Sequence, residues 1–238
     1  MKKILFITTL TMSALLQAGD DSFITRTELG YIKTDGNTNT EAFNLDAKAK
    51  RKWEWHSLSM ELDAQLARSN HSQTQSRYAA ELNYDYEYSD VLSYGYIGAY
   101  KRDKFSGYDY QFYTGPDVKY RAIISEPENL TLELALLYAQ EKLEVGGGDE
   151  YASYRLRGLY DYQLLQNLRF WQDLSFRGSF EDTQNYFIVS KTSLTSKISD
   201  MLSAGVSYRI DHSNIVPQDR KQTDRTFMVN LIMDYTAF

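Results

Sequence analysis

The stretch LNYDYEYSDVLSYGYIGAY, residues 82–100, contains the pattern that decides the fold. In its first half, leucine and tyrosine at even-numbered positions alternate with asparagine, aspartate and glutamate at odd-numbered positions. Because successive side chains of a β-strand point to opposite faces, this alternation predicts a strand with one aromatic face and one polar face. Ser89 and Asp90 form a turn, after which leucine and tyrosine return at even positions. The stretch therefore predicts a hairpin of two amphipathic strands.

Two classes of protein contain such hairpins. In a soluble β-sandwich the aromatic face packs into a protein core and the polar face contacts water. In an outer-membrane barrel the aromatic face contacts lipid and the polar face lines the lumen. The alternation continues from residue 22 to the end of the chain in units of about ten residues, each followed by a turn. We count about twelve strands, an even number, as expected for an all-β, transmembrane, antiparallel up-and-down barrel.

The predicted links between strands differ in length. Links after even-numbered strands are mostly short: 54–56, 89–90, 124–129, 164–167 and 199–200. Links after odd-numbered strands are mostly longer and more polar: 34–40, 69–75, 102–107, 142–150, 182–185 and 213–222. Bacterial outer-membrane barrels have short periplasmic turns and longer outer loops, so this pattern predicts that both termini are periplasmic.

Aromatic residues of the apolar face gather near the strand ends. Near the short links they are Trp53, Tyr86, Tyr88, Tyr94, Tyr120, Tyr162 and Phe170. Near the long links they are Tyr31, Tyr78, Tyr100, Tyr108, Tyr138, Tyr154 and Tyr186. Leucine, alanine, valine and isoleucine fill most of the face between them. Two aromatic girdles around an aliphatic band are typical of a barrel in a bilayer, whereas a sandwich more often has its large aromatics at mid-strand. We therefore predict an outer-membrane barrel.

Composition and the first residues bound the compartment and the class of function. Residues 1–18 have a basic start, an apolar run and a small residue at Ala18, which predicts a secretory signal peptide followed by one barrel domain, residues 19–238. The chain has no cysteine, which excludes disulfides, thiolate metal sites and lipoprotein acylation. Its net charge of −6 disfavours nucleic acid as a partner.

A turn motif near the start of the barrel resembles that of a known family. Gly30-Tyr31 followed by TDGNTNT, residues 34–40, is similar to the first hairpin, G-Y-x-x-T-x-G-N-T-x-T, of bacterial proteins named as salt-induced outer membrane proteins. The matching residues are Gly30, Tyr31, Thr34, Gly36, Asn37, Thr38 and Thr40. The resemblance implies an outer-membrane β-barrel and a link to salt or osmotic stress. It implies no catalytic or ligand residues.

The polar face of the predicted barrel carries charges of both signs in nearly every strand. The candidate lumen-lining residues are Lys48, Lys50, Lys52, Glu61, Asp63, Glu81, Asp85, Arg155, Arg157, Arg169, Asp173 and Arg177. Barrels of about eight strands are filled by side chains and those of about 16–18 leave an aqueous channel, so twelve strands lie between these cases. The charges could form ladders along a narrow, weakly selective pore for small hydrophilic solutes. They could equally pair across the lumen and plug it, as in a structural envelope protein.

Few residues indicate catalysis. The segment RIDHSN, 209–214, invites comparison with outer-membrane lipases that use a histidine and a serine on one face of the barrel. Here His212 and Ser213 are adjacent, so a regular strand points them to opposite faces. We predict that the protein is not an enzyme and needs no cofactor or metal; a lipid- or peptide-hydrolysing barrel enzyme is the alternative.

The predicted barrel also indicates how its paired acidic residues interact and which partners the protein contacts. Glu61 with Asp63, and Asp85 with Glu87, are two residues apart and share a face. They could form a carboxylate dyad or bind cations, but we expect them to pair with Lys and Arg of neighbouring strands. The expected partners are outer-membrane lipid and lipopolysaccharide, the barrel-insertion machinery during assembly, and small hydrophilic solutes. Phe238 is an aromatic C-terminal residue, as in many outer-membrane barrels. The preceding aromatic is Tyr235, whereas the alternation of a strand would put an aromatic residue at position 236.

Overall fold

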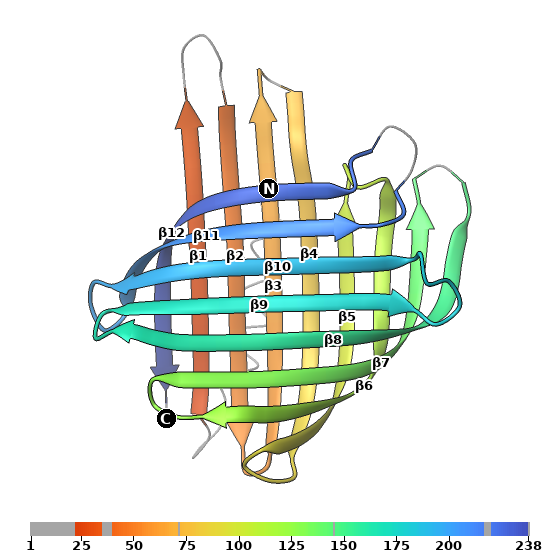
Figure 1. Ribbon diagram of the computed structural model, residues 1–238. Coiled ribbons are helices and arrows are strands. Elements are labelled where there is room, and N and C mark those ends of the chain that lie inside the picture. Colours follow the sequence, from red (N-terminus) through yellow and green to blue (C-terminus); the bar gives the residue numbers. More distant parts are fainter. Residues whose placement is uncertain (1–21, 35–39, 71, 145, 217–219, 238) are drawn as a thin grey trace.

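The described residues of the computed structural model, 22–34, 40–70, 72–144, 146–216 and 220–237, form a closed antiparallel barrel (Figure 1). Its strands are β1 (Ser22–Thr34), β2 (Thr40–Trp53), β3 (His56–Ser69), β4 (Ser72–Glu87), β5 (Leu92–Asp103), β6 (Tyr108–Ile124), β7 (Glu128–Leu143), β8 (Gly148–Leu165), β9 (Leu168–Ser179), β10 (Tyr186–Lys197), β11 (Leu202–Ser213) and β12 (Thr223–Ala237). Each strand pairs with its neighbours in sequence, and β1 pairs with β12. The predicted twelve-stranded up-and-down order is confirmed.

The alternation of side chains along each strand determines the two faces of the barrel wall. On β7, Leu132, Leu134 and Leu136 point outward and are about half exposed, at 45 %, 49 % and 54 %. Between them Glu133 and Ala135 point inward and are buried. Closing the sheet removes both free edges, so every strand has two hydrogen-bonded neighbours. An apolar outer face and a polar inner face follow directly from the period of two.

Two of the predicted long links are shorter than expected. The link predicted at 69–75 is shorter, because β3 extends to Ser69 and β4 begins at Ser72, with a register shift between Ala67 and Arg68. The link predicted at 142–150 shrinks because β8 begins at Gly148 and pairs with Lys142. Polar strand ends that lack apolar partners are hard to distinguish from loops by composition. The predicted signal peptide, Gly36, Asn37, Thr38 and Phe238 lie outside the described residues.

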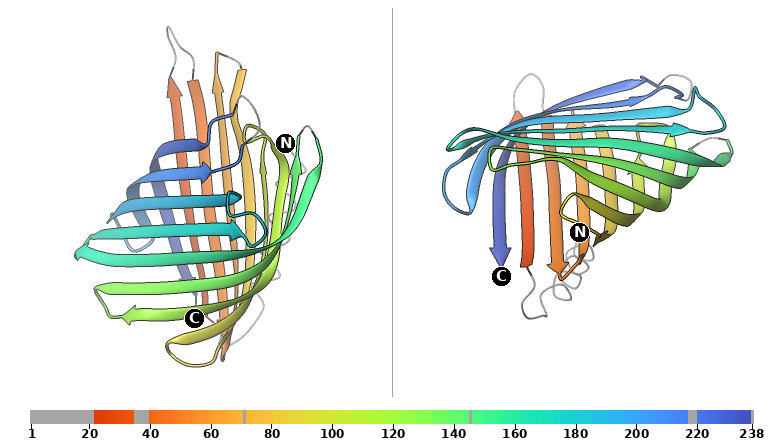
Figure 2. Two further views of the ribbon diagram at one scale, coloured as in Figure 1. Left: turned by 45° about the vertical axis from the view of Figure 1, so that its right-hand side comes forward. Right: turned by 60° about the horizontal axis from the view of Figure 1, so that its bottom comes forward.

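The two walls of the barrel face each other with their strands crossing. In Figure 1, strands β8–β11 run across strands β1–β4, which lie behind them. The second view in Figure 2 shows the same two walls, one over the other. Inward side chains from these walls therefore meet across the lumen. Ser22 and Ala237, the first and last described residues, lie at the end of the barrel that holds the links after even-numbered strands.

A small apolar cluster lies on the inner side of β5, β6 and β7. Ile97 on β5 and Ala135 and Leu137 on β7 are buried and pack with Tyr113 of β6. Between these strands, β6 contains Gly115-Pro116, where a proline removes a ladder donor. A Cβ atom at Gly115 would lie 2.0 Å from the carbonyl oxygen of Leu136, so β7 can approach because no side chain is present.

One aromatic residue of the predicted girdle points inward instead. A register shift between Tyr108 and Tyr110 turns Tyr108 into the lumen, where it is 6 % exposed. Its ring contacts Phe187, at 6.2 Å between centroids, and its hydroxyl donates to the carbonyl of Ile215 at 3.3 Å. The prediction that placed Tyr108 in the outer girdle is wrong, because a bulge reverses the alternation.

A charged lumen as the candidate functional site

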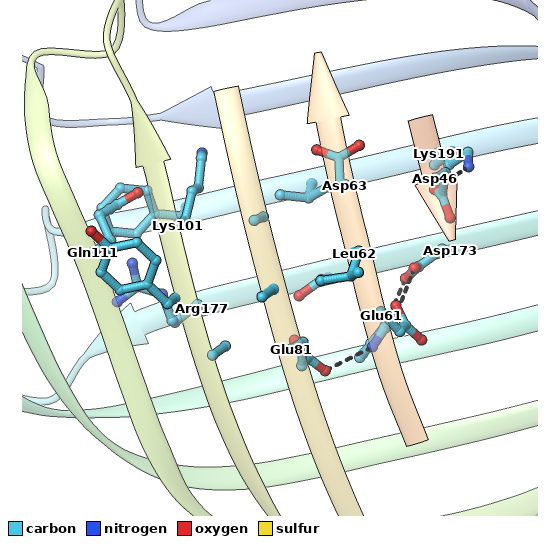
Figure 3. Close-up of a pocket in the computed structure, with 18 of the residues that line it drawn as sticks. Asp46, Glu61, Leu62, Asp63, Glu81, Lys101, Gln111, Asp173, Arg177 and Lys191 are labelled. Atoms are coloured by element: carbon cyan, nitrogen blue, oxygen red, sulfur yellow. Dashed lines mark hydrogen bonds and ion pairs between the residues drawn. The ribbon is translucent and has the colours of Figure 1, made fainter. Parts of the chain in front are cut away.

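A cavity of about 180 Å³ lies between the two walls (Figure 3). Strands β2–β6 supply one side of it and β8–β11 the other. Figure 3 shows Lys101 and Gln111 on the first side, and Asp173, Arg177 and Lys191 on the second. This volume is many times the roughly 10–15 Å³ that one water molecule needs by the same measure. The cavity can therefore hold several waters or a small solute.

Most of the candidate lumen residues line this cavity. They are Lys48, Glu61, Asp63, Glu81, Arg155, Arg157, Asp173 and Arg177. Lys50, Lys52, Asp85 and Arg169 also stand at inward positions of their strands, but they lie outside the cavity. The structure thus brings two-thirds of the set together. A role of these residues in a pore stays a prediction.

A first group of ion pairs joins β8 to the opposite wall. Arg155 binds Glu81 of β4, with 2.7 Å between Nη1 and Oε2, and also Glu133 of β7 at 2.8 Å. Arg157 reaches Glu81 at 3.3 Å and Glu61 of β3 at 3.4 Å. The planar guanidinium group has five donors in a fixed fork, so one arginine can hold two carboxylates.

A second group joins β10 and β11 to the first four strands. The ammonium of Lys191 lies 2.7 Å from Asp46 of β2 and 3.1 Å from Glu28 of β1. Arg77 of β4 contacts Asp211 of β11 at 2.7 Å. Together the two groups tie the walls to each other through charged side chains rather than through an apolar core.

The contribution of these ion pairs to stability depends on the cost of removing their charges from water. Glu133, Arg155 and Arg177 are each no more than 7 % exposed. Removing such groups from water is costly, and their mutual attraction offsets that cost only when every partner is present. The pairs therefore specify how the walls meet more than they add stability. Losing one partner leaves a charge without compensation.

Charges near the even-numbered links form a separate cluster. Arg121 of β6 contacts Glu87 of β4 at 3.1 Å, and Lys52 of β2 binds the same carboxylate. Lys119 binds Asp85 on the neighbouring part of β4. Each member of the two acidic pairs singled out in the sequence has a basic partner, so the expected ion pairing is confirmed. Glu61 and Asp63 each have a partner on a neighbouring strand, whereas the partners of Asp85 and Glu87 lie on β6 and β2, two strands away.

His212 and Ser213 do not form a pair. His212 Nδ1 lies 2.8 Å from the hydroxyl of Thr223, and its ring lies 5.9 Å from that of Tyr186. The Ser213 hydroxyl donates to the carbonyl of Ile215 at 2.6 Å. The geometry around His212 therefore gives no support to the alternative of a barrel hydrolase.

The sequence pattern did not predict the aromatic residues inside the lumen. Trp171 has the ammonium of Lys48 4.9 Å from its ring centroid, and Phe187 has the guanidinium of Arg177 at 4.2 Å. Such cation–π contacts contribute most where water is excluded. One signal could have placed Trp171 in the lumen: it stands at an odd-numbered position of β9, like the inward residues Arg169 and Asp173. From the sequence we assign neither Trp171 nor Phe187 to a face.

Comparison with known proteins agrees with the barrel. A family model described as "Protein of unknown function, DUF481" matches residues 27–235. The NanC porin structure is similar at a TM-score of 0.53 and 12 % identity, covering 91 % of this chain and 98 % of that one. The KdgM porin in complex with disordered oligogalacturonate scores 0.49 at 14 % identity, with 91 % and 99 % covered. The translocator domain of autotransporter NalP from Neisseria meningitidis scores 0.45 at 11 %, with 97 % and 93 % covered. No curated protein sequence matches.

Proposed function

The chain belongs to the family described as protein of unknown function, DUF481, and from this premise we propose that it is an outer-membrane barrel forming a narrow passive pore for small hydrophilic solutes. The outer face supports the membrane part of the proposal. Half-exposed leucine, valine and tyrosine side chains cover that face, as on Leu134, Val206 and Tyr94. A barrel that exposes this much apolar surface is stable in lipid, because closing the sheet satisfies the backbone hydrogen-bonding groups of every strand.

The observation that carries the pore is the charged cavity enclosed by the strands. A polar lumen is what distinguishes a barrel that passes solutes from one filled by a core. The cavity of about 180 Å³ is bounded by charged side chains of both walls. The ion pairs from Arg155 and Lys191 cross the lumen and set its width. The pore is therefore expected to be narrow.

Orientation and partners complete the proposal. The end that holds Ser22, Ala237 and the even-numbered links is placed in the periplasm, and the other end faces outward with lipopolysaccharide around it. Residues 1–18 direct export and are removed, and the barrel-insertion machinery assembles the remainder. Sequencing the N-terminus of the protein purified from outer membranes tests the cleavage site. A mature chain that still begins at Met1 would contradict it.

The experiment for the pore is single-channel recording in planar lipid bilayers. The refolded barrel is expected to give small, discrete conductance steps in potassium chloride. Heat-denatured protein at the same detergent concentration is the control. Conductance no higher than that control would overturn the pore.

A structural envelope component is the second candidate, and the cross-lumen ion pairs favour it. Arg77–Asp211 and Arg157–Glu61 join opposite walls in the same structure. A barrel braced in this way would conduct no ions and would stiffen the envelope. The recording above separates the two candidates, because they share the fold and differ in conductance.

The link to salt or osmotic stress rests on the resemblance of the turn motif and stays a prediction. It is tested by measuring transcript and protein levels in cells moved to high salt, together with the growth of a deletion strain. Unchanged expression and unchanged growth would remove it.

A further inference from the structure

The cations that line the cavity outnumber the anions. The basic residues are Lys48, Arg77, Lys101, Arg155, Arg157, Arg177, Lys191 and Arg209. The acidic residues are Asp46, Glu61, Asp63, Glu81 and Asp173. A cleft lined by an excess of one sign of charge between walls of low dielectric attracts solutes of the opposite sign. Among the lining residues the excess is positive. Four carboxylates just outside the lining, Glu28, Glu133, Glu141 and Asp211, pair with five of these cations, so the excess is confined to the surface of the cavity.

One of these cations has no partner among the described residues. Lys101 of β5 faces Ala79 and Gln111 in the strand register and forms no ion pair or hydrogen bond with the described part of the chain. Every other cation of the cavity has a carboxylate within 4 Å. Those pairs are Lys48–Glu61, Arg77–Asp211, Arg155–Glu81, Arg157–Asp173, Arg177–Glu141, Lys191–Asp46 and Arg209–Asp211.

The nearby carboxylates are held by other groups. Asp103, two positions along β5, accepts from the backbone N–H of Phe105 at 3.1 Å and forms no ion pair with Lys101. Asp211 accepts from both Arg77 and Arg209, each at 2.7 Å. Gln111, next to Lys101, donates its amide to Glu141 at 2.9 Å, and Glu141 also holds Arg177 at 2.7 Å. A partly buried ammonium that is not paired is costly, and an anion from solution would relieve that cost.

We infer that Lys101 is the anion-binding point of the lumen, and that the pore takes small solutes carrying a single carboxylate or phosphate group. This inference rests on the proposed pore and names its class of solute. The acidic group of the solute contacts the Lys101 ammonium, and its hydroxyl or amide groups contact Gln111 and waters of the cavity. Figure 3 shows the Lys101 side chain extending into the space between the walls. The limited volume restricts the solute to a small one.

The first experiment measures ion selectivity. Reversal potentials in a potassium chloride gradient are compared for the wild type, Lys101→Gln and Lys50→Gln. Lys50 is the matched control, because it is an inward lysine that forms no ion pair with the described residues and lies outside the cavity. The ratio of chloride to potassium permeability is expected to fall at least about twofold for Lys101→Gln and less for Lys50→Gln. An equal effect of both variants would overturn the inference.

The second experiment needs no transport and so separates the anion site from the pore. Trp53→Phe with Trp55→Phe leaves Trp171, which lines the cavity, as the single tryptophan. Iodide is expected to quench it, and inorganic phosphate or acetate at constant ionic strength is expected to reduce that quenching. Lys101→Gln should lower iodide quenching by at least about twofold while quenching by neutral acrylamide is unchanged. Iodide quenching that does not respond to Lys101→Gln would overturn the anion site, even if the barrel conducts. A barrel that does not conduct, but whose iodide quenching falls on Lys101→Gln, would overturn the proposed pore and leave the anion site in place.

Discussion

Arg155 and Glu81 form a bidentate ion pair across the lumen, although they lie 74 positions apart in the sequence. Nη1 donates to Oε2 at 2.7 Å and Nη2 donates to Oε1 at 3.0 Å. The arginine is 4 % exposed and the glutamate 13 %. Two parallel bonds between planar groups fix the distance and the angle between the walls. This contact therefore defines how β8 stands against β4.

Removing one side of this pair is expected to destabilise the barrel. Glu81→Gln should lower the free energy of unfolding by about 3–5 kcal/mol, because the Arg155 guanidinium stays buried with less compensation. Arg155→Met should lower the free energy of unfolding by at least as much, because it leaves both Glu81 and the buried Glu133 without this partner. Urea unfolding in lipid vesicles, followed by tryptophan fluorescence, measures both.

The control for that series is Lys197→Gln. Lys197 pairs with Asp200 beside the β10–β11 link, where Asp200 is almost fully exposed, at 97 %. Exposed pairs of this kind contribute little, so no measurable change is expected. Equal losses for Glu81→Gln and Lys197→Gln would contradict the special position of the Arg155–Glu81 pair.

Arg157→Ala is expected to raise the single-channel conductance. Its side chain spans the lumen to Glu61 and Glu81, so truncation widens the narrow level of the barrel. Arg169→Ala removes the same charge, but Arg169 pairs with Asp161 of the adjacent strand and lies outside the cavity. Only the first variant should conduct more than the wild type. Equal conductance of the two variants would show that the side chain of Arg157 does not limit passage.

The period of two explains why the sequence was enough to place side chains inside or outside. Every candidate lumen residue, from Lys48 to Arg177, stands at an inward position, since closing the sheet preserves the alternation of each strand. The exception was Tyr108, where a bulge that no composition signal marks reverses the faces.

Contacts across the lumen could not be predicted in the same way. Whether Glu81 meets Arg155 or Arg169 depends on how far the strands are staggered around the closed barrel, and no local pattern reports that stagger. The apolar inward residues Ile97 and Leu137 were missed for a related reason. A lumen position is polar only where water reaches it, and the packing of neighbouring strands decides this.

Gly115→Ala is expected to impair folding. A Cβ at this position would lie 2.0 Å from the Leu136 carbonyl oxygen, so the β6 and β7 backbones would have to separate. Gly98→Ala, on the adjacent β5, is the matched control, because its Cβ would meet nothing nearer than Thr114 Oγ1 at 4.0 Å. Overpacking of this kind costs about 1–3 kcal/mol or more. The yield of the heat-modifiable folded band on cold gel electrophoresis compares them, and equal yields would contradict the close approach.

The outer face provides the last test, which concerns the membrane itself. Leu134 points outward at mid-height of β7 and is 49 % exposed, so it contacts the centre of the bilayer if the chain spans a membrane. Leu134→Arg should then cost about 2–4 kcal/mol of unfolding free energy in lipid vesicles, because a charge at the midplane loses its water. Leu165→Arg, at the end of β8 beside a short link, should cost roughly 0–1 kcal/mol, because its charge reaches the interface.

Both variants replace a leucine with an arginine. A difference between their costs in unfolding free energy therefore reports the depth of each position in the bilayer and not the loss of a leucine. Both leucines are strongly exposed, at 49 % and 62 %, so neither change opens a cavity in a packed core. In a barrel that stood in water, arginine would be tolerated at both positions to a similar degree. A cost at Leu134 that does not exceed the cost at Leu165 would therefore contradict the membrane-spanning orientation, whatever the conductance of the lumen.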